Sequence, residues 1–127
     1  MSEPSWVSEM EDWTVVPDGL AYEVSSFGRV RSTRLGRSKM LKIHETREGR
    51  FWIALGLGKR GRRKYWGLPR LILQSFEPLP PEEFAELEAC HLNDRRDDNR
   101  LANLAWGTHE QNLDHTAKSR WDADRDD

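Results

Sequence analysis

Residues 90–112 read CHLNDRRDDNRLANLAWGTHEQN, and this stretch decides the fold of the second half of the chain. It starts in a short apolar run and continues into a polar loop, which is typical of a strand that ends in a turn. Thr108 and Gln111 have the spacing of a capping box, which marks the start of a helix. The stretch and its flanks predict a strand over residues 88–92, a loop over 93–100, a returning strand up to residue 106 and a helix over 109–118.

Three polar residues of this stretch fall on different elements: His91 on the strand, Asn103 in a loop and Asn112 on the helix. Packing the helix against the strand would bring His91 close to Asn112. An asparagine oxygen suits hard cations such as Mg2+ and Mn2+, and a histidine beside such a cation can take a proton from an attacking water. The residues alone leave two interpretations open, a small metal site with a general base or a structural histidine with satisfied polar atoms.

The preceding part of the chain predicts a β-rich module followed by a helix. Short alternating segments broken by glycine and proline turns are typical of half-buried strands. Pro69 suits the first turn of a helix whose apolar face carries Leu71, Ile72, Leu73 and Phe76. We therefore expect an α+β protein, with strands over residues 13–16, 20–24, 29–32, 40–43 and 51–57 and a further helical turn over 82–87. The predicted parts are a basic β-rich module (1–67), a second module (68–121) and an acidic tail (122–127), all within one domain.

The net charge of −2 conceals a segregation along the chain. Residues 1–20 carry −5, residues 21–80 carry +10 and residues 81–127 carry −7. A strongly basic segment between acidic ends is typical of a surface that binds a polyanion, although an ordinary solvated surface is the alternative. The side chains expected to contact DNA phosphates are Arg29, Arg31, Arg34, Arg37, Lys39, Arg60, Arg62, Arg63 and Lys64.

Length and composition exclude several classes of protein. A chain of 127 residues is long enough for one domain. The single cysteine, Cys90, excludes an intrachain disulfide and any zinc site built on two or more cysteines. No apolar run approaches the roughly 18 residues of a membrane span, and the acidic N-terminal segment is unlike a leader peptide. We therefore expect a cytoplasmic protein without membrane association.

The stretch from Cys90 to Asn112 resembles the HNH endonucleases of the phage and homing type. In that family a histidine is followed by an Asn-Arg-x-x-Asn-Leu-x-Trp-x-Thr segment and then by a further asparagine. The intervals here are also similar, with twelve residues from His91 to Asn103 and twenty-one from His91 to Asn112. Two more segments resemble parts of these nucleases: residues 68–76 their upstream helix, and YEVSSFGRVRS at 22–32, with Trp13, a module that precedes many of them.

The resemblance implies a ββα-metal fold and a role for each matching residue. His91 would be the general base that activates water, and Asn112 would be a metal ligand on the helix. Asn103 would serve catalysis by orienting the loop that carries His91. Where the family often has an aspartate as the second ligand, this chain has Cys90, which is then either a metal ligand or a small buried residue. Other residues that could replace the aspartate are Asp94, Asp98 and His115, besides a backbone carbonyl.

The function that the resemblance implies is metal-dependent hydrolysis of phosphodiester bonds in double-stranded DNA, one strand per active site. The expected cofactor is Mg2+ or Mn2+, with Zn2+ or Ni2+ as alternatives because a thiolate is a soft ligand. A catalytically inactive DNA-binding protein on the HNH scaffold is one alternative, which Cys90 favours, and an RNA-directed module is another. Such nucleases are common in bacteriophages, so the host cytoplasm is the expected compartment. The oligomeric state, monomer or dimer, stays open.

Overall fold

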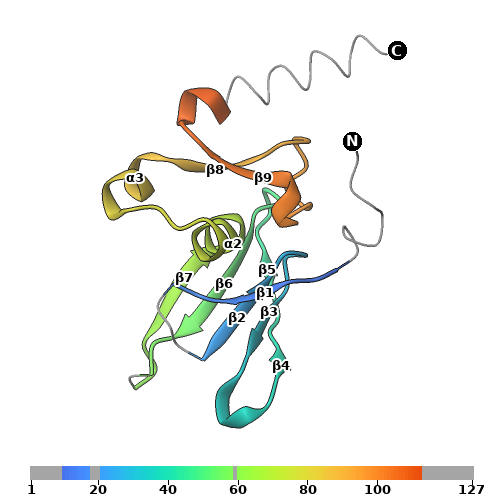
Figure 1. The fold of residues 1–127 in the computed structure, drawn as a ribbon, viewed down its shortest axis with the longest axis vertical. Helices are drawn as coiled ribbons and strands as arrows, with labels where there is room; N and C mark the ends of the chain where they lie inside the picture. The colour runs from blue at the N-terminus through green and yellow to red at the C-terminus, as the bar shows by residue number, and fades with distance from the viewer. Residues whose placement is uncertain (1–9, 18–20, 59, 113–127) are drawn as a thin grey trace.

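The computed structural model describes residues 10–17, 21–58 and 60–112, and it has the predicted α+β fold (Figure 1). Two antiparallel sheets form the first half of the chain, and a two-stranded ribbon with short helices forms the second. Within the described ranges, no helix is long and apolar enough to cross a membrane.

The first sheet has the strand order β1-β2-β3-β4. Val24 lies opposite Val30 in the register of β2 and β3, and both side chains are buried. Val30 is buried between the more exposed Arg29 and Arg31, so the alternation predicted for residues 29–32 is confirmed. The elements are β1 (Trp13–Val15), β2 (Tyr22–Ser25), β3 (Val30–Ser32) and β4 (Lys39–Met40), with a 3-10 turn at Arg34–Gly36 between the last two.

The second sheet has the order β5-β6-β7, formed by His44–Glu45, Phe51–Gly56 and Arg63–Gly67. Ile53 and Leu55 are buried in the core, while the other residues of β6 are only partly buried. The strand predicted over residues 40–43 is wrong in its extent, because β4 ends at Met40. Leu41 and Ile43 instead pack against the core as the chain crosses from one sheet to the other.

Helix α2 (Leu68–Phe76) lies between the two sheets and the ribbon (Figure 1). Its consecutive residues Leu71, Ile72 and Leu73 are all fully buried. A helix on a protein surface would bury one face only, so this burial shows that protein surrounds α2. The core consequently joins residues from both predicted modules, for example Val24 and Leu104.

The second half of the chain follows the predicted strand–loop–strand–helix order. Its elements are α3 (Pro81–Glu86), β8 (Glu88–His91), a 3-10 turn (Leu101–Asn103) and β9 (Leu104–Gly107), which pairs antiparallel with β8. The capping box is confirmed: the Thr108 backbone N–H donates to Gln111 Oε1 (2.8 Å), and the Gln111 N–H donates to Thr108 Oγ1 (3.0 Å). Residues 109–112 are helical; the rest of the predicted helix, His115 and the acidic tail lie outside the described residues.

A turn of the first sheet holds the loop that follows β8. The Leu101 N–H donates to the Ser26 carbonyl (2.8 Å), and the buried Ser25 hydroxyl accepts from the N–H groups of Phe27 and Arg29. Gly28 has a φ of +91°, and a Cβ added there would lie 2.9 Å from the Asn99 carbonyl oxygen. The turn can approach the loop this closely because residue 28 has no side chain.

This contact predicts that Gly28→Ala destabilises the protein more than a glycine substitution of equal backbone strain. Gly49→Ala is the matched control, since Gly49 has a φ of +81° but no atom within 4 Å of an added Cβ. The left-handed backbone should cost each variant about 1–2 kcal/mol, and Gly28→Ala should lose more because it also displaces Asn99. Urea unfolding of both variants measures the difference, and equal losses would contradict the prediction.

Candidate functional site

A cavity of about 520 Å³ lies where the first turn of α2, strand β8, the loop after it and residues 109–112 meet. It contains both predicted residues His91 and Asn112, whose side chains come from the end of β8 and from the final helix. The other charged or titratable residues that line it are Arg50, Arg70, Glu88, Asp94, Arg96 and His109.

His91 is held by Asn99, a residue of the loop between the two ribbon strands. The His91 Nε2 atom lies 2.7 Å from Asn99 Oδ1, and the Asn99 amide nitrogen donates to the Arg96 carbonyl (3.2 Å). That second bond fixes which end of the amide faces His91. Because an amide oxygen only accepts, Nε2 carries the proton and Nδ1 of the neutral ring is left as the acceptor. The contact with Asn99 therefore leaves Nδ1 as the ring nitrogen of the half-buried imidazole that can accept a hydrogen bond.

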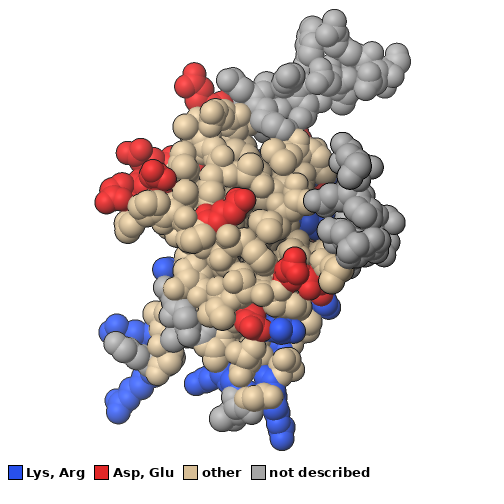
Figure 2. Space-filling model, viewed as in Figure 1, with Lys and Arg blue, Asp and Glu red and all other residues tan. Residues whose placement is uncertain are grey.

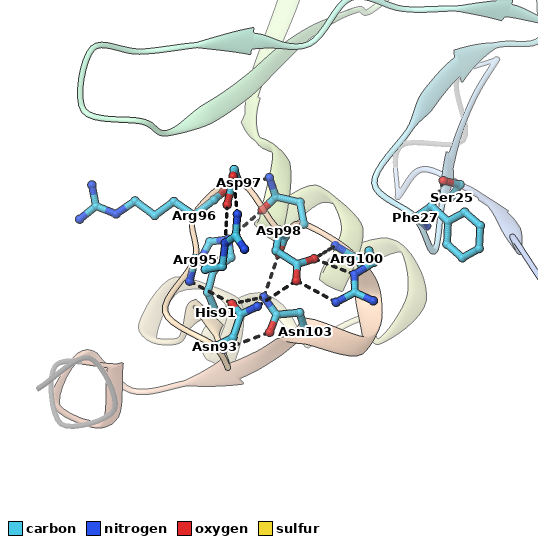
Figure 3. A network of polar contacts seen from close by, with 11 residues as sticks. Ser25, Phe27, His91, Asn93, Arg95, Arg96, Asp97, Asp98, Arg100 and Asn103 are labelled. Atoms are coloured by element: carbon cyan, nitrogen blue, oxygen red, sulfur yellow. Dashed lines mark hydrogen bonds and ion pairs between the residues drawn. The ribbon is translucent and has the colours of Figure 1, made fainter. Parts of the chain in front are cut away.

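Asn103 fixes the shape of this loop and does not line the cavity. Its side chain is buried, accepts from the Asn93 N–H (3.0 Å), and donates to Asn93 Oδ1 (2.8 Å) and the Asp98 carbonyl (2.9 Å). The Asp98 carboxylate in turn accepts from Asn93 and from Arg100. Figure 3 shows these side chains converging inside the loop. This arrangement is compatible with the orienting role that the resemblance implies for Asn103.

Three polar side chains meet on the side of β8 that faces the final helix. Glu88 Oε1 accepts from the Asn112 amide (3.1 Å), and Glu88 Oε2 lies 2.7 Å from His109 Nδ1. These two hydrogen bonds and the charge of Arg70 lower the pKa of Glu88, with the Asn112 bond contributing most, so that the carboxylate is ionised at neutral pH. Asn112 is thus paired with an acidic side chain inside the cavity.

This pair has the chemistry that a hard divalent cation requires. Carboxylate and amide oxygens are the ligands that Mg2+ and Mn2+ prefer. Among the described residues, no group of three or more histidine, cysteine, aspartate or glutamate side chains is gathered around a common point. A cation held by two such oxygens would complete its coordination with water or substrate oxygens, as Mg2+ often does.

Cys90 lies beside Gly107 of the neighbouring strand and is not among the residues that line the cavity. It is buried, and an added Cβ at Gly107 would lie 2.9 Å from its sulfur. Burial and the nearby Glu88 charge raise the pKa of the thiol, which keeps it protonated at neutral pH. These surroundings are those of a small buried side chain, and ligation of a metal by Cys90 stays a prediction.

The predicted DNA-contacting residues fall into three groups. Arg29 and Arg31 are paired with Glu11 and Glu23, and the Arg31 guanidinium also lies over the Trp13 ring. Lys64 lies over the Trp66 ring, with its Nζ 4.3 Å from the centroid. The third group has exposed side chains that form no ion pair with another described residue: Arg34, Arg37, Lys39, Arg60, Arg62 and Arg63.

Several of these exposed arginines surround a second hollow at the far end of the sheets. Arg34, Arg60, Arg62 and Arg63 line it together with Tyr22, whose hydroxyl accepts from the Gly56 N–H (3.1 Å). Figure 2 shows Lys and Arg gathered at the end of the molecule that carries the β3–β4 and β6–β7 turns, whereas acidic residues gather around α3. The predicted charge segregation along the sequence is therefore also a segregation in space.

The two-stranded ribbon, the capped helix that follows it and the histidine at the end of β8 give the second half of the chain an HNH-like fold. A solved structure described as DNA binding and cleavage by the HNH homing endonuclease I-HmuI is similar to this chain, with a TM-score of 0.69 and 28% sequence identity. The similarity covers 84% of this chain and 58% of that one, so the chain spans somewhat more than half the length of I-HmuI. No family model and no curated protein matches the chain.

Sequence reasoning missed Glu88 and Asn99. Glu88 lies three residues before His91 in the predicted strand, and side chains two positions apart on a strand share a face, so Glu88 lies on the same face as Cys90. This shared face was the one sequence feature that could have indicated Glu88, because its contact with Asn112 joins residues 24 positions apart. Asn99 belongs to a polar loop in which solvation is the usual role, and its burial at 7% exposure follows from the packing of Gly28 and Leu101.

The loop's ion pair predicts a pH-dependent contribution to stability. Hydrogen bonding to Arg100 holds the pKa of Asp98 well below its usual range. A depressed folded-state pKa contributes stability above the unfolded-state value, and this contribution is lost as the pH falls. Asp98→Asn should therefore be less stable than the wild type at neutral pH, and the gap should close progressively below about pH 5. Urea unfolding at a series of pH values measures it, and a gap independent of pH would contradict the assignment.

Proposed function

We propose that this protein is a metal-dependent DNA endonuclease of the HNH type that hydrolyses one strand per active site. The observation that carries the proposal is the bond from His91 Nε2 to Asn99, which leaves Nδ1 of the ring as an acceptor in a cavity that also contains Glu88 and Asn112. The similarity to the HNH homing endonuclease I-HmuI supports it.

In this mechanism His91 Nδ1 takes a proton from a water molecule, whose oxygen attacks the phosphorus in line. A new phosphorus–oxygen bond forms and the bond to the 3′ oxygen breaks, and that oxygen then takes a proton from solvent. A divalent cation held by Asn112 and an acidic partner supplies charge stabilisation for the reacting phosphate when bound. Arg50, Arg70 and Arg96 around the cavity favour a polyanionic substrate.

The exposed arginines at the other end of the sheets supply the second part of the proposed DNA surface. Arg34, Arg60, Arg62 and Arg63 are available for phosphate contacts, since they line an open hollow and their guanidinium groups are exposed. Phosphate contacts position a duplex without reading its sequence. The proposed substrate is therefore double-stranded DNA that extends from this end towards the cavity, and the proposed compartment is the cytoplasm, of the host cell if a phage encodes the chain.

The mechanism predicts that His91→Ala abolishes cleavage and retains DNA binding. Loss of a general base typically lowers the rate by about 10²–10⁴. DNA binding should change little, because the half-buried ring offers little contact area to the duplex. Conversion of supercoiled plasmid, with Mg2+ or Mn2+ and with EDTA, measures the cleavage; a gel shift in EDTA measures the binding. A His91→Ala preparation that cuts at the wild-type rate would refute the mechanism.

The same assay separates the alternatives. Wild-type protein that binds the plasmid but leaves it intact in every metal would be an inactive DNA-binding scaffold. Preferential binding or cleavage of RNA would indicate the RNA-directed module. Nicked plasmid that precedes linear product would indicate independent cuts of the two strands, whereas simultaneous cutting would require two copies of the chain.

The basic hollow predicts a change in the salt dependence of DNA binding. Each phosphate contact contributes about 0.9 to the slope of log K against log salt for duplex DNA. Replacing Arg60, Arg62 and Arg63 together by Gln should lower that slope by about two to three. Lys64→Gln is the matched control, because the Lys64 ammonium lies over Trp66 instead of lining the hollow. An unchanged slope in the triple variant would mean that the duplex binds elsewhere.

A further inference from the structure

We infer that Glu88 and Asn112 together hold the divalent cation and that Glu88 supplies the carboxylate ligand. In the HNH pattern the residue directly before the histidine supplies it, and that residue is Cys90 in this chain. This inference rests on the proposed function, since it names the acidic partner of Asn112 in the same cavity. It assigns to Cys90 a packing role only.

The position of Glu88 on β8 allows it to take this role. Residues 88 and 90 lie two apart on one strand, so their side chains leave the same face of the ribbon. The Cys90 sulfur packs against Gly107 under the start of the final helix and does not reach the cavity. Glu88 has a longer side chain, and its two oxygens reach Asn112 and His109 on that helix.

The contacts of Glu88 fix the position of its carboxylate, as a metal ligand requires. One oxygen, Oε2, is oriented by His109 at 2.7 Å, and the other, Oε1, faces the Asn112 amide at 3.1 Å. Rotating that amide by half a turn exchanges its nitrogen for its oxygen, a torsion with a broad energy minimum. Glu88 Oε1 and Asn112 Oδ1 would then both be available to hold a cation, with His109 still at hydrogen-bonding distance from Oε2. His109 would then be the outer-shell group that orients a ligating carboxylate by a hydrogen bond.

The donor set also selects the metal. A carboxylate oxygen and an amide oxygen are hard ligands and favour Mg2+ or Mn2+, whereas a thiolate would favour softer ions. A site built on Glu88 therefore binds Mn2+ without Cys90, and a site built on Cys90 would bind Cd2+ with a sulfur-to-metal absorption band in the ultraviolet.

The test is Mn2+ binding, measured by calorimetry and by the loss of the free-ion electron paramagnetic resonance signal. It is made with the full chain alone and with the chain bound to a short duplex, in the absence of turnover. Glu88→Gln should weaken Mn2+ binding by at least about tenfold. Glu86→Gln is the matched control, because it removes the same charge from an exposed residue of α3 that does not line the cavity. Cys90→Ala should bind Mn2+ as the wild type does and give no difference in Cd2+ absorption.

Thermal unfolding of each variant shows whether it is folded, and Glu88→Asp provides a second variant that retains the charge but shortens the reach. It should bind Mn2+ more weakly than the wild type. Unchanged Mn2+ affinity in Glu88→Gln, or its loss in Cys90→Ala, would overturn the inference, as would a wild-type chain that binds no Mn2+ in either state. Because binding is measured without cleavage, Mn2+ bound through Glu88 by a chain that cuts no DNA would refute the proposed nuclease and still support the ligand.

Discussion

The burial of helix α2 between the two sheets and the ribbon is the constraint on which the rest of the structure depends. Leu71, Ile72 and Leu73 follow one another in sequence and are all fully buried, which requires the sheets to cover one side of the helix and the β8–β9 ribbon to cover the other. Burying each such side chain contributes about 1.5–3 kcal/mol, so the ribbon cannot move away without exposing the core. The first turn of α2 also forms a wall of the cavity through Pro69 and Arg70. The site is thus fixed to the same helix that joins the two halves of the chain.

The loop between the ribbon strands holds the His91 side chain in a defined position relative to this rigid frame. Asn103 and Asp98 close the loop by hydrogen bonds to its own backbone and side chains, and Asn99 passes the constraint to the imidazole. Gly28 of the first sheet approaches the Asn99 carbonyl. The Arg96 guanidinium of the loop donates to the Glu48 carbonyl (2.8 Å), which lies between β5 and β6 of the second sheet. A base that must accept one particular proton needs its ring held in one tautomer and orientation. Residues from both halves of the chain thus hold the loop and ring that the proposed mechanism uses.

Charge divides the molecule into two regions. The cavity combines arginines with Glu88 and Asp94, which are the charges that the proposed phosphate and cation would require. The far end of the sheets carries arginines around an open hollow and has few acids nearby (Figure 2). Arg29 and Arg31 belong to neither region, since Glu11 and Glu23 neutralise them at the first sheet. The nine basic residues expected from sequence to contact DNA therefore differ in their surroundings. Those that line the hollow are the ones that the proposed DNA surface uses.

The sequence by itself determined the α+β class, most of the strands, the capped start of the final helix and the likeness of residues 90–112 to an HNH motif, because these depend on local periodicity and on motif spacing. It also marked His91 and Asn112, which the structure brings into one cavity. Only the tertiary structure decided how residues 41–43 cross between the sheets, which arginines are already paired, that Asn99 holds His91, and that Glu88 instead of Cys90 faces Asn112. Each of these depends on contacts between residues far apart in sequence or on the direction in which a side chain leaves its strand, and a linear pattern does not specify which partner such a side chain finds.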